Sequence, residues 1–146
     1  MSESYVRGPI EARRAPFLEL AQADWDAMVA EVREVFLGAR DYARGGEAGR
    51  IVFVSAAAAA RPIAGATLEG VAGAFLTTVA QVAAVELRDQ GITANVVVPA
   101  LEADPQAVDA VVGFLLSDDA RGVTGAVISA DGGFSITKRS EPNPLL

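Results

Sequence analysis

The sequence contains no cysteine and no histidine, and its only lysine is Lys138. Without cysteine the chain has neither disulfides nor thiolate chemistry. The absence of both residue types also excludes a conventional zinc site and a histidine-based triad, so only carboxylates remain as candidate metal ligands, for magnesium or calcium. Neither Tyr5 nor Tyr42 has a lysine four residues later. A phenolate whose pKa is lowered by a neighbouring ammonium group therefore cannot be built from this chain.

Basic residues are also scarce, with 12 Lys and Arg against 19 Asp and Glu and a net charge of −7. Arg13 and Arg14 form a pair and not a basic patch, so we expect no binding to nucleic acid. The segment from Met1 to Glu19 is too polar and acidic for a secretory signal. The longest span without charge, Gly70 to Val85, is shorter than the roughly 20 apolar residues that cross a bilayer. We therefore expect a soluble, cytoplasmic protein without membrane contact.

The 146 residues, of which 51% are hydrophobic, suffice for one core and one domain covering residues 1–146. Nothing in the composition divides the chain in two. Residues 138–146, with Pro142 and Pro144, predict an extended tail.

Three long helices are predicted from apolar spacing and from residues typical of helix ends. In the first, Asp24 is the expected cap and the helix ends before Gly45. Its apolar positions recur every three or four residues and are Trp25, Met28, Val29, Val32, Val35, Phe36 and Ala39. The second is expected to begin with Thr67 as its cap and to run to about Asp89, with Gly91 as its stop. The third begins after Asp104 and continues through Leu116.

Short β-branched runs alternate with these helices at residues 50–55, 92–98 and 127–130. The first two have no polar alternation, as expected for strands that are covered on both faces. Strands that alternate with helices predict a parallel sheet wound by right-handed crossovers. The fold class is therefore α/β, a partial Rossmann-like three-layer fold with a short parallel sheet of about three to four strands flanked by helices. Asp131 to Gly133 predicts a turn after the last strand.

Several landmarks together resemble the short-chain dehydrogenase/reductase family. Residues 49–99 are similar to its strand, catalytic helix and next strand, with Val85-Glu86-Leu87 matching the end of that helix. Phe17 to Trp25 resembles the entry into the family's fourth helix, and Val123 to Gly133 its last strand and closing turn. On these landmarks the chain is identified as a truncated, degenerate member of the family that corresponds to its C-terminal half only.

The resemblance implies that the family's catalytic side chains are missing. Counting back from residues 85–87 puts the family's tyrosine at Glu69, its lysine at Gly73 and its serine at Ala56. Ser55 lies one position early, on the opposite side of a strand. The glycines fit no phosphate-binding fingerprint. We therefore expect no catalytic, cofactor-binding or metal-binding residues in this chain, and we expect NAD(P) to bind to a partner chain.

The strands of the family's dinucleotide half have no counterpart in this sequence, nor has its substrate-covering loop after Pro99. A missing neighbour would expose an apolar edge beside residues 50–55. The segment Tyr5-Val6-Arg7 could pair there as an edge strand, or a partner chain could cover the edge.

Two carboxylate sites remain open alternatives. Glu69 could act as an acid or base, although a carboxylate in the first turn of a helix more often stabilises the helix dipole. Asp118 and Asp119, together with Asp104, could bind a metal, although a solvated loop explains them more simply.

The resemblance favours assembly over catalysis, because the family packs its fourth and fifth helices against a neighbouring subunit and this chain has kept both. The candidate interface residues are Trp25, Met28, Val32, Phe36, Phe75, Val79, Val82 and Phe134. Our hypothesis is a non-catalytic subunit that pairs with a full-length dehydrogenase/reductase in a hetero-oligomer. The alternatives are a cofactor-independent lyase, cyclase or isomerase that uses a carboxylate, and a homo-oligomeric binding or scaffold protein.

Overall fold

The chain folds around one parallel β-sheet, and the computed structural model describes residues 4–137. The sheet contains β1 (Ser4–Arg7), β2 (Gly49–Val54), β3 (Ile92–Pro99) and β4 (Val127–Ala130), in that spatial order. All three pairings are parallel. The predicted fold class is confirmed, with four strands at the upper end of the expected number. The predicted tail, residues 138–146, lies outside the described residues.

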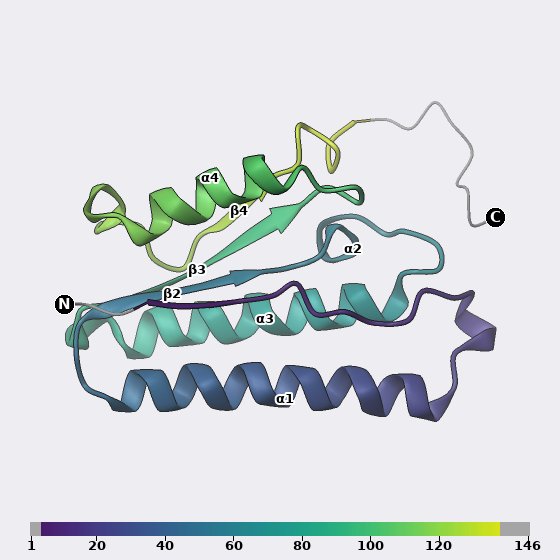
Figure 1. Cartoon of the computed structure of the whole chain (residues 1–146), viewed down its shortest axis with the longest axis horizontal. Coiled ribbons are helices and arrows are strands. Elements are labelled where there is room, and N and C mark those ends of the chain that lie inside the picture. The colour runs from purple at the N-terminus through teal and green to yellow at the C-terminus, as the bar shows by residue number, and fades with distance from the viewer. Residues whose placement is uncertain (1–3, 138–146) are drawn as a thin grey trace.

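Helices cover both faces of the sheet and complete the three layers (Figure 1). Helices α1 (Gln22–Arg44) and α3 (Thr67–Glu86) lie on one face, and α4 (Pro105–Leu116) lies on the other. A single helical turn, α2 (Ala57–Ala60), follows β2. Three short 3-10 turns link the main elements: η1 (Phe17–Glu19), η2 (Arg88–Gln90) and η3 (Asp118–Ala120).

The edge of the sheet beside β2 is covered by the chain's own N-terminal segment. In the parallel register, Tyr5 lies opposite Ile51 and Arg7 lies opposite Phe53. This confirms that Tyr5-Val6-Arg7 acts as an edge strand, the first of the two predicted solutions. The apolar β2 is therefore an internal strand, and the short β1 becomes the edge.

Alternation along the strands divides the core into two clusters. Ile51 and Phe53 face α1 and α3, where they join buried side chains such as Val35 and Leu76. Their neighbours in β2 face α4 and form the second cluster, whose buried members are Val52, Val54, Val97, Val108, Leu115 and Ala120. Both faces of each central strand are thus buried, which explains their uninterrupted apolar sequence.

The helix ends differ from the prediction at two of the three starts. Asp24 lies inside α1 and its carboxylate accepts a hydrogen bond from the Ala21 amide, 2.8 Å, so it is not the cap. Thr67 is the first residue of α3 and its side chain makes no capping bond. Asp104 does cap α4, accepting from the Gln106 amide at 3.0 Å. The pattern of apolar residues locates helices, but local hydrogen bonds shift their ends by a few residues.

The end of α3 also comes earlier than predicted, at Glu86 and not Asp89. The chain then tightens into η2, and Gly91 follows with φ of 75°. A left-handed residue at this point favours glycine because it has no β-carbon. The predicted stop at Gly91 is therefore confirmed, while the last residues before it are 3-10 and not α-helical.

Within residues 4–137, α3 is long and apolar enough to cross a membrane when judged by length and composition alone, with a mean hydropathy of 1.5. Its inner side packs against the sheet, where Leu68, Leu76 and Ala80 are at most 2% exposed. The helix is also apolar on its outer side, where Phe75 and Val82 are about half exposed. Burial in the core explains the apolar residues on the inner side of α3. Those on the outer side are not covered within the single chain.

Candidate functional site

The carboxyl ends of the strands open onto a small cleft of about 290 Å³. Ligands of open α/β sheets commonly bind at this edge. Here the cleft is lined by the loop after β1, the start of α2, the first turn of α3 and the short connection after β3, and its polar residues include Glu11, Arg14, Ser55 and Glu69. Residues 100–104 connect β3 directly to α4, so no long loop covers the opening.

An ion pair closes one side of this cleft. The Nε of Arg14 donates to Oε1 of Glu69 at 2.7 Å, with the two side chains 45% and 15% exposed. The loop that carries Arg14 is fixed by a hydrogen bond from the Ala15 amide to the Gly65 carbonyl, 3.0 Å. The hydrogen bond to Glu69 raises the pKa of the Arg14 guanidinium above its usual value. The sequence did not indicate this contact, because its partners are 55 residues apart and no local pattern links them.

Gly73, at the position of the family's lysine, has no room for a side chain. A β-carbon there would lie 2.5 Å from Ser55 Oγ and 2.8 Å from the Ala59 side chain. The amide nitrogen of Ala56 would be 3.1 Å away. Ser55 is itself only 1% exposed, and its hydroxyl makes no hydrogen bond in the described structure. The end of β2 and the α2 turn therefore fill the space that a lysine on α3 would need.

The other candidate carboxylates do not converge. Asp104 caps α4, whereas Asp118 and Asp119 belong to η3 and are exposed. Across residues 4–137 no cluster of three acidic, histidine or cysteine side chains could hold a metal ion.

The candidate interface residues separate into surface and core. Trp25, Phe36, Phe75 and Val82 are between 42% and 49% exposed on α1 and α3. Val79 is half-buried beside them. The remaining α1 candidates, Met28 at 3% and Val32 at 4% exposed, lie in the core of the single chain, so the described structure does not present them to a partner. Both residues point inward because only part of the apolar pattern of α1 faces the sheet, and they lie in that part.

Phe134, the last candidate, lies away from the two helices, in the turn after β4. Its ring lies under the Arg61 guanidinium, 5.4 Å from ring centre to charge, and its carbonyl accepts a hydrogen bond from the same side chain at 2.9 Å. Asp131 fixes this turn by accepting from the amides of Gly133 and Ser135, each at 3.0 Å. This agrees with the predicted turn at Asp131 to Gly133.

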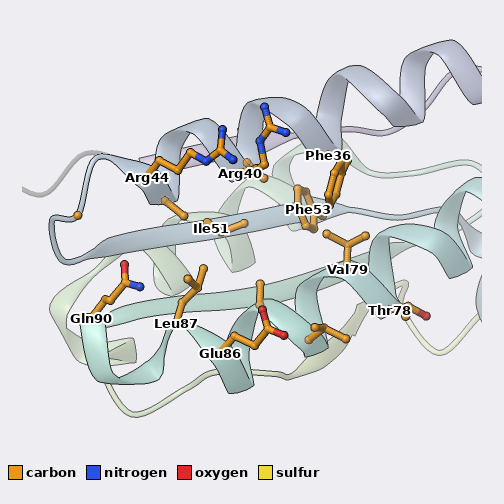
Figure 2. A pocket seen from close by; sticks show the side chains of 15 residues that line it. Phe36, Arg40, Arg44, Ile51, Phe53, Thr78, Val79, Glu86, Leu87 and Gln90 are labelled. Carbon is orange, nitrogen blue, oxygen red and sulfur yellow. The ribbon is translucent and has the colours of Figure 1, made fainter.

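A second and larger cavity, about 590 Å³, lies between α1 and α3 (Figure 2). Its floor is formed by Ile51 and Phe53 of β2, and its walls come from the later parts of both helices. Arg40 and Arg44 line one side, while Glu86 and Gln90 are on the other. The sequence does not indicate this groove, because the groove depends on how far apart the two helices are held.

The family is shown by comparison with known proteins. Residues 8–103, more than half of the chain, match the family model described as Enoyl-(Acyl carrier protein) reductase. Among solved structures, acetoin dehydrogenase from Enterobacter cloacae aligns with a TM-score of 0.85 at 24% identity, covering 96% of this chain and 67% of that one. A protein described as a short chain dehydrogenase/reductase family protein aligns at 0.76 and 23% identity, covering 91% and 67%. The chain therefore belongs to the short-chain dehydrogenase/reductase family.

A third structure, angucycline C-6 ketoreductase LanV with bound NADP, aligns with a TM-score of 0.83 at 24% identity and covers 92% of this chain and 63% of that one. At such identities the structural likeness concerns the fold. This chain spans about two thirds of the length of these structures. No curated protein matches the sequence significantly.

Proposed function

We propose that this chain is a non-catalytic subunit that assembles with a full-length short-chain dehydrogenase/reductase and supports its NAD(P)-dependent oxidation or reduction of a hydroxy or keto group. The reaction, the cofactor and the substrate belong to the partner chain. Location in the cytoplasm is part of the same proposal.

The filled position at Gly73 is the observation that carries the proposal. Ser55 Oγ and Ala59 occupy the space of a side chain at this position, and Glu69 stands where the family has its tyrosine. Within the described residues, no lysine accompanies a tyrosine on any helix. The tyrosine and lysine pair that would provide an activated phenol is therefore replaced here by Glu69 and by a glycine packed against its neighbours.

The outer side of α1 and α3 supports the assembly part of the proposal. Most of the large apolar side chains that are exposed lie on η1, α1 or α3: Phe17, Leu18, Trp25, Phe36, Val71, Phe75, Val82 and Val85. Exposed apolar side chains gathered on neighbouring helices in this way are typical of a protein interaction site. Aromatic residues such as Trp25 and Phe75 are also the types that dominate binding energy at interfaces.

The test is native mass spectrometry of the tagged chain purified from its own cells. A defined complex with a complete dehydrogenase/reductase, which binds NAD(P)H through that partner alone, is the expected result. Phe75→Asp should dissociate the complex, whereas Phe114→Asp on the exposed side of α4 should leave it intact. A stable homo-oligomer without any partner would contradict the proposal.

A second candidate function is a cofactor-independent enzyme, favoured by the position of Glu69 in the 290 Å³ cleft. Its carboxylate already binds Arg14 at 2.7 Å, so a substrate would have to displace or share that guanidinium. Glu69→Gln would abolish such an activity while leaving complex formation unchanged. The two candidates are therefore separable with one variant.

A further inference from the structure

Two buried polar side chains meet near the amino end of the sheet. Arg50 in β2 lies directly opposite Thr93 in β3 in the parallel register. Both side chains lie on the face of the sheet that α4 covers, because they alternate in step with Val52 and Val97 of the α4 cluster. Neighbouring strands are only about 4.8 Å apart, so the two side chains are adjacent.

Neither side chain has all its hydrogen-bonding groups satisfied. Nε of Arg50 and Oγ1 of Thr93 are buried atoms, and neither has a hydrogen-bond partner in the part of the chain that the structure describes. Within residues 4–137 the one other buried side-chain atom in this state is Ser55 Oγ, just beyond the opposite end of β2. Because buried polar groups are nearly always paired, two adjacent unpaired donors indicate a shared acceptor.

Asn95, two residues further along β3 on the same face, shows the contrast. Its side-chain amide donates to the Val123 carbonyl at 2.9 Å and accepts from the Ala126 amide at 2.9 Å. The loop after η3 therefore satisfies Asn95 completely but leaves the hydroxyl of Thr93, which is 7% exposed, without a partner. The polar groups of this face are thus paired by the protein at one position and not at the next.

The guanidinium of Arg50 also lacks a close counter-charge. Its side chain is only 15% exposed. The carboxylate that faces it, Oδ1 of Asp118 in η3, lies 4.0 Å from Nη2, and the Asp118 side chain is fully exposed. Water screens an exposed carboxylate at this distance, so Asp118 compensates the charge of Arg50 incompletely. A largely buried cation beside an unpaired hydroxyl favours a bound anion.

We propose that Arg50 Nε and Thr93 Oγ1 together bind one chloride ion beside η3. The guanidinium N–H and the threonine O–H can both donate to one acceptor, and hydrogen bonds to an ionised acceptor are the stronger kind. A water molecule would accept the same bonds but would leave the charge of Arg50 uncompensated. A multiply charged oxyanion such as phosphate suits the place less well, because Asp118 would repel it.

The experiment measures thermal unfolding of the full chain while chloride replaces gluconate at constant ionic strength. Only the folded chain contains the site, so the midpoint should rise saturably, by about 3 °C when chloride reaches about ten times its dissociation constant. Thr93→Val keeps the shape of the side chain and removes the hydroxyl. In gluconate this variant should be at least as stable as wild type, because an unpaired polar group has been removed. In chloride it should be less stable, with chloride binding weakened at least about tenfold.

Thr124→Val is the matched control. It removes the hydroxyl that accepts a hydrogen bond from the Ala94 amide at 3.1 Å, on the same strand but outside the proposed site. Its effect on the midpoint should be the same in both salts. Arg50→Met should abolish the response to chloride, and if that variant does not fold, Thr93→Val decides the question alone.

Bromide supplies a direct view of the site, because it replaces chloride and scatters X-rays anomalously. Crystals of the chain grown in bromide should show an anomalous peak in contact with both Arg50 Nε and Thr93 Oγ1. The same peak should be missing in crystals of Thr93→Val.

Three results would overturn the proposal. An equal response to chloride in wild type and Thr93→Val would reflect the bulk salt alone. An anomalous map without a peak would show that the two atoms are paired in another way. A bromide peak without any difference in stability between the two proteins would mean an adventitious ion only. None of these measurements involves complex formation, so the partner-subunit proposal is tested separately.

Discussion

The hydroxyl of Tyr5 donates a hydrogen bond to the main-chain carbonyl of Val35, 3.1 Å away, and so ties the edge strand β1 to helix α1. The same ring packs edge-on against Phe53 and stacks with Tyr42. Burial raises the pKa of Tyr5, with Arg7 acting in the opposite direction. One side chain thus connects the strand, the helix and the core, and so holds β1 in place at the edge of the sheet.

Tyr5→Phe should lower the free energy of unfolding by about 1 kcal/mol, because it removes one partly buried hydrogen bond and leaves the ring in place. Chemical denaturation followed by circular dichroism measures the change. A loss of several kcal/mol would show that removing the hydroxyl disturbs more of the fold than this one hydrogen bond.

Gly38→Ala should destabilise the protein by about 1–3 kcal/mol, because a β-carbon at this position would overlap the Tyr5 ring and hydroxyl. Gly113→Ala is the matched control in α4, where nothing lies within 4 Å of the added carbon. It should stabilise by about 0.5–1 kcal/mol, as alanine does in an open helix position. Thermal melts of the two variants should therefore shift in opposite directions, and equal shifts would contradict the packing of Tyr5 on α1.

Restoring the family's residues should not restore nucleotide binding. Glu69→Tyr with Gly73→Lys places a phenol and an amine at the expected positions, but the lysine side chain would clash with Ser55 and Ala59. We expect no quenching or energy transfer with NADPH, and a loss of stability of about 1–3 kcal/mol from Gly73→Lys alone. Measurable NADPH binding by the double variant would show that α2 moves aside.

Acid should weaken the turn after β4. Hydrogen bonding, first from the Ser135 side chain and then from main-chain amides, holds the pKa of Asp131 below its usual 3.8. A lowered pKa contributes stability that is present above the unfolded value and is lost as the pH falls through the folded value. The stability difference between wild type and Asp131→Asn should therefore be constant near neutral pH and shrink below about pH 4. Carboxyl NMR would check the midpoint, and a value at or above 3.8 would contradict this account.

The element order was predictable because each segment carries its own period. The continuous apolar runs of β2 and β3 and the three- and four-residue spacing in α1 are local properties. The starts of α1 and α3 were predicted less well. Asp24 and Thr67 are both residue types that can cap a helix, and only the surrounding hydrogen bonds decide whether they do. Met28 and Val32 were included among the interface candidates for a related reason: spacing defines an apolar stripe but not which part of it the sheet will cover.

The sequence by itself determined the class of fold, the family and the absence of any tyrosine with a lysine four residues later, because these follow from residue types at fixed intervals along the chain. Only the tertiary structure decided that Arg14 reaches Glu69, that Ser55 fills the space at Gly73, and that a groove opens between α1 and α3. These contacts join residues far apart in sequence, and their existence depends on the distances at which the sheet holds the helices and loops. The sequence supplies the residues of each contact, but only the packing of the fold brings them together.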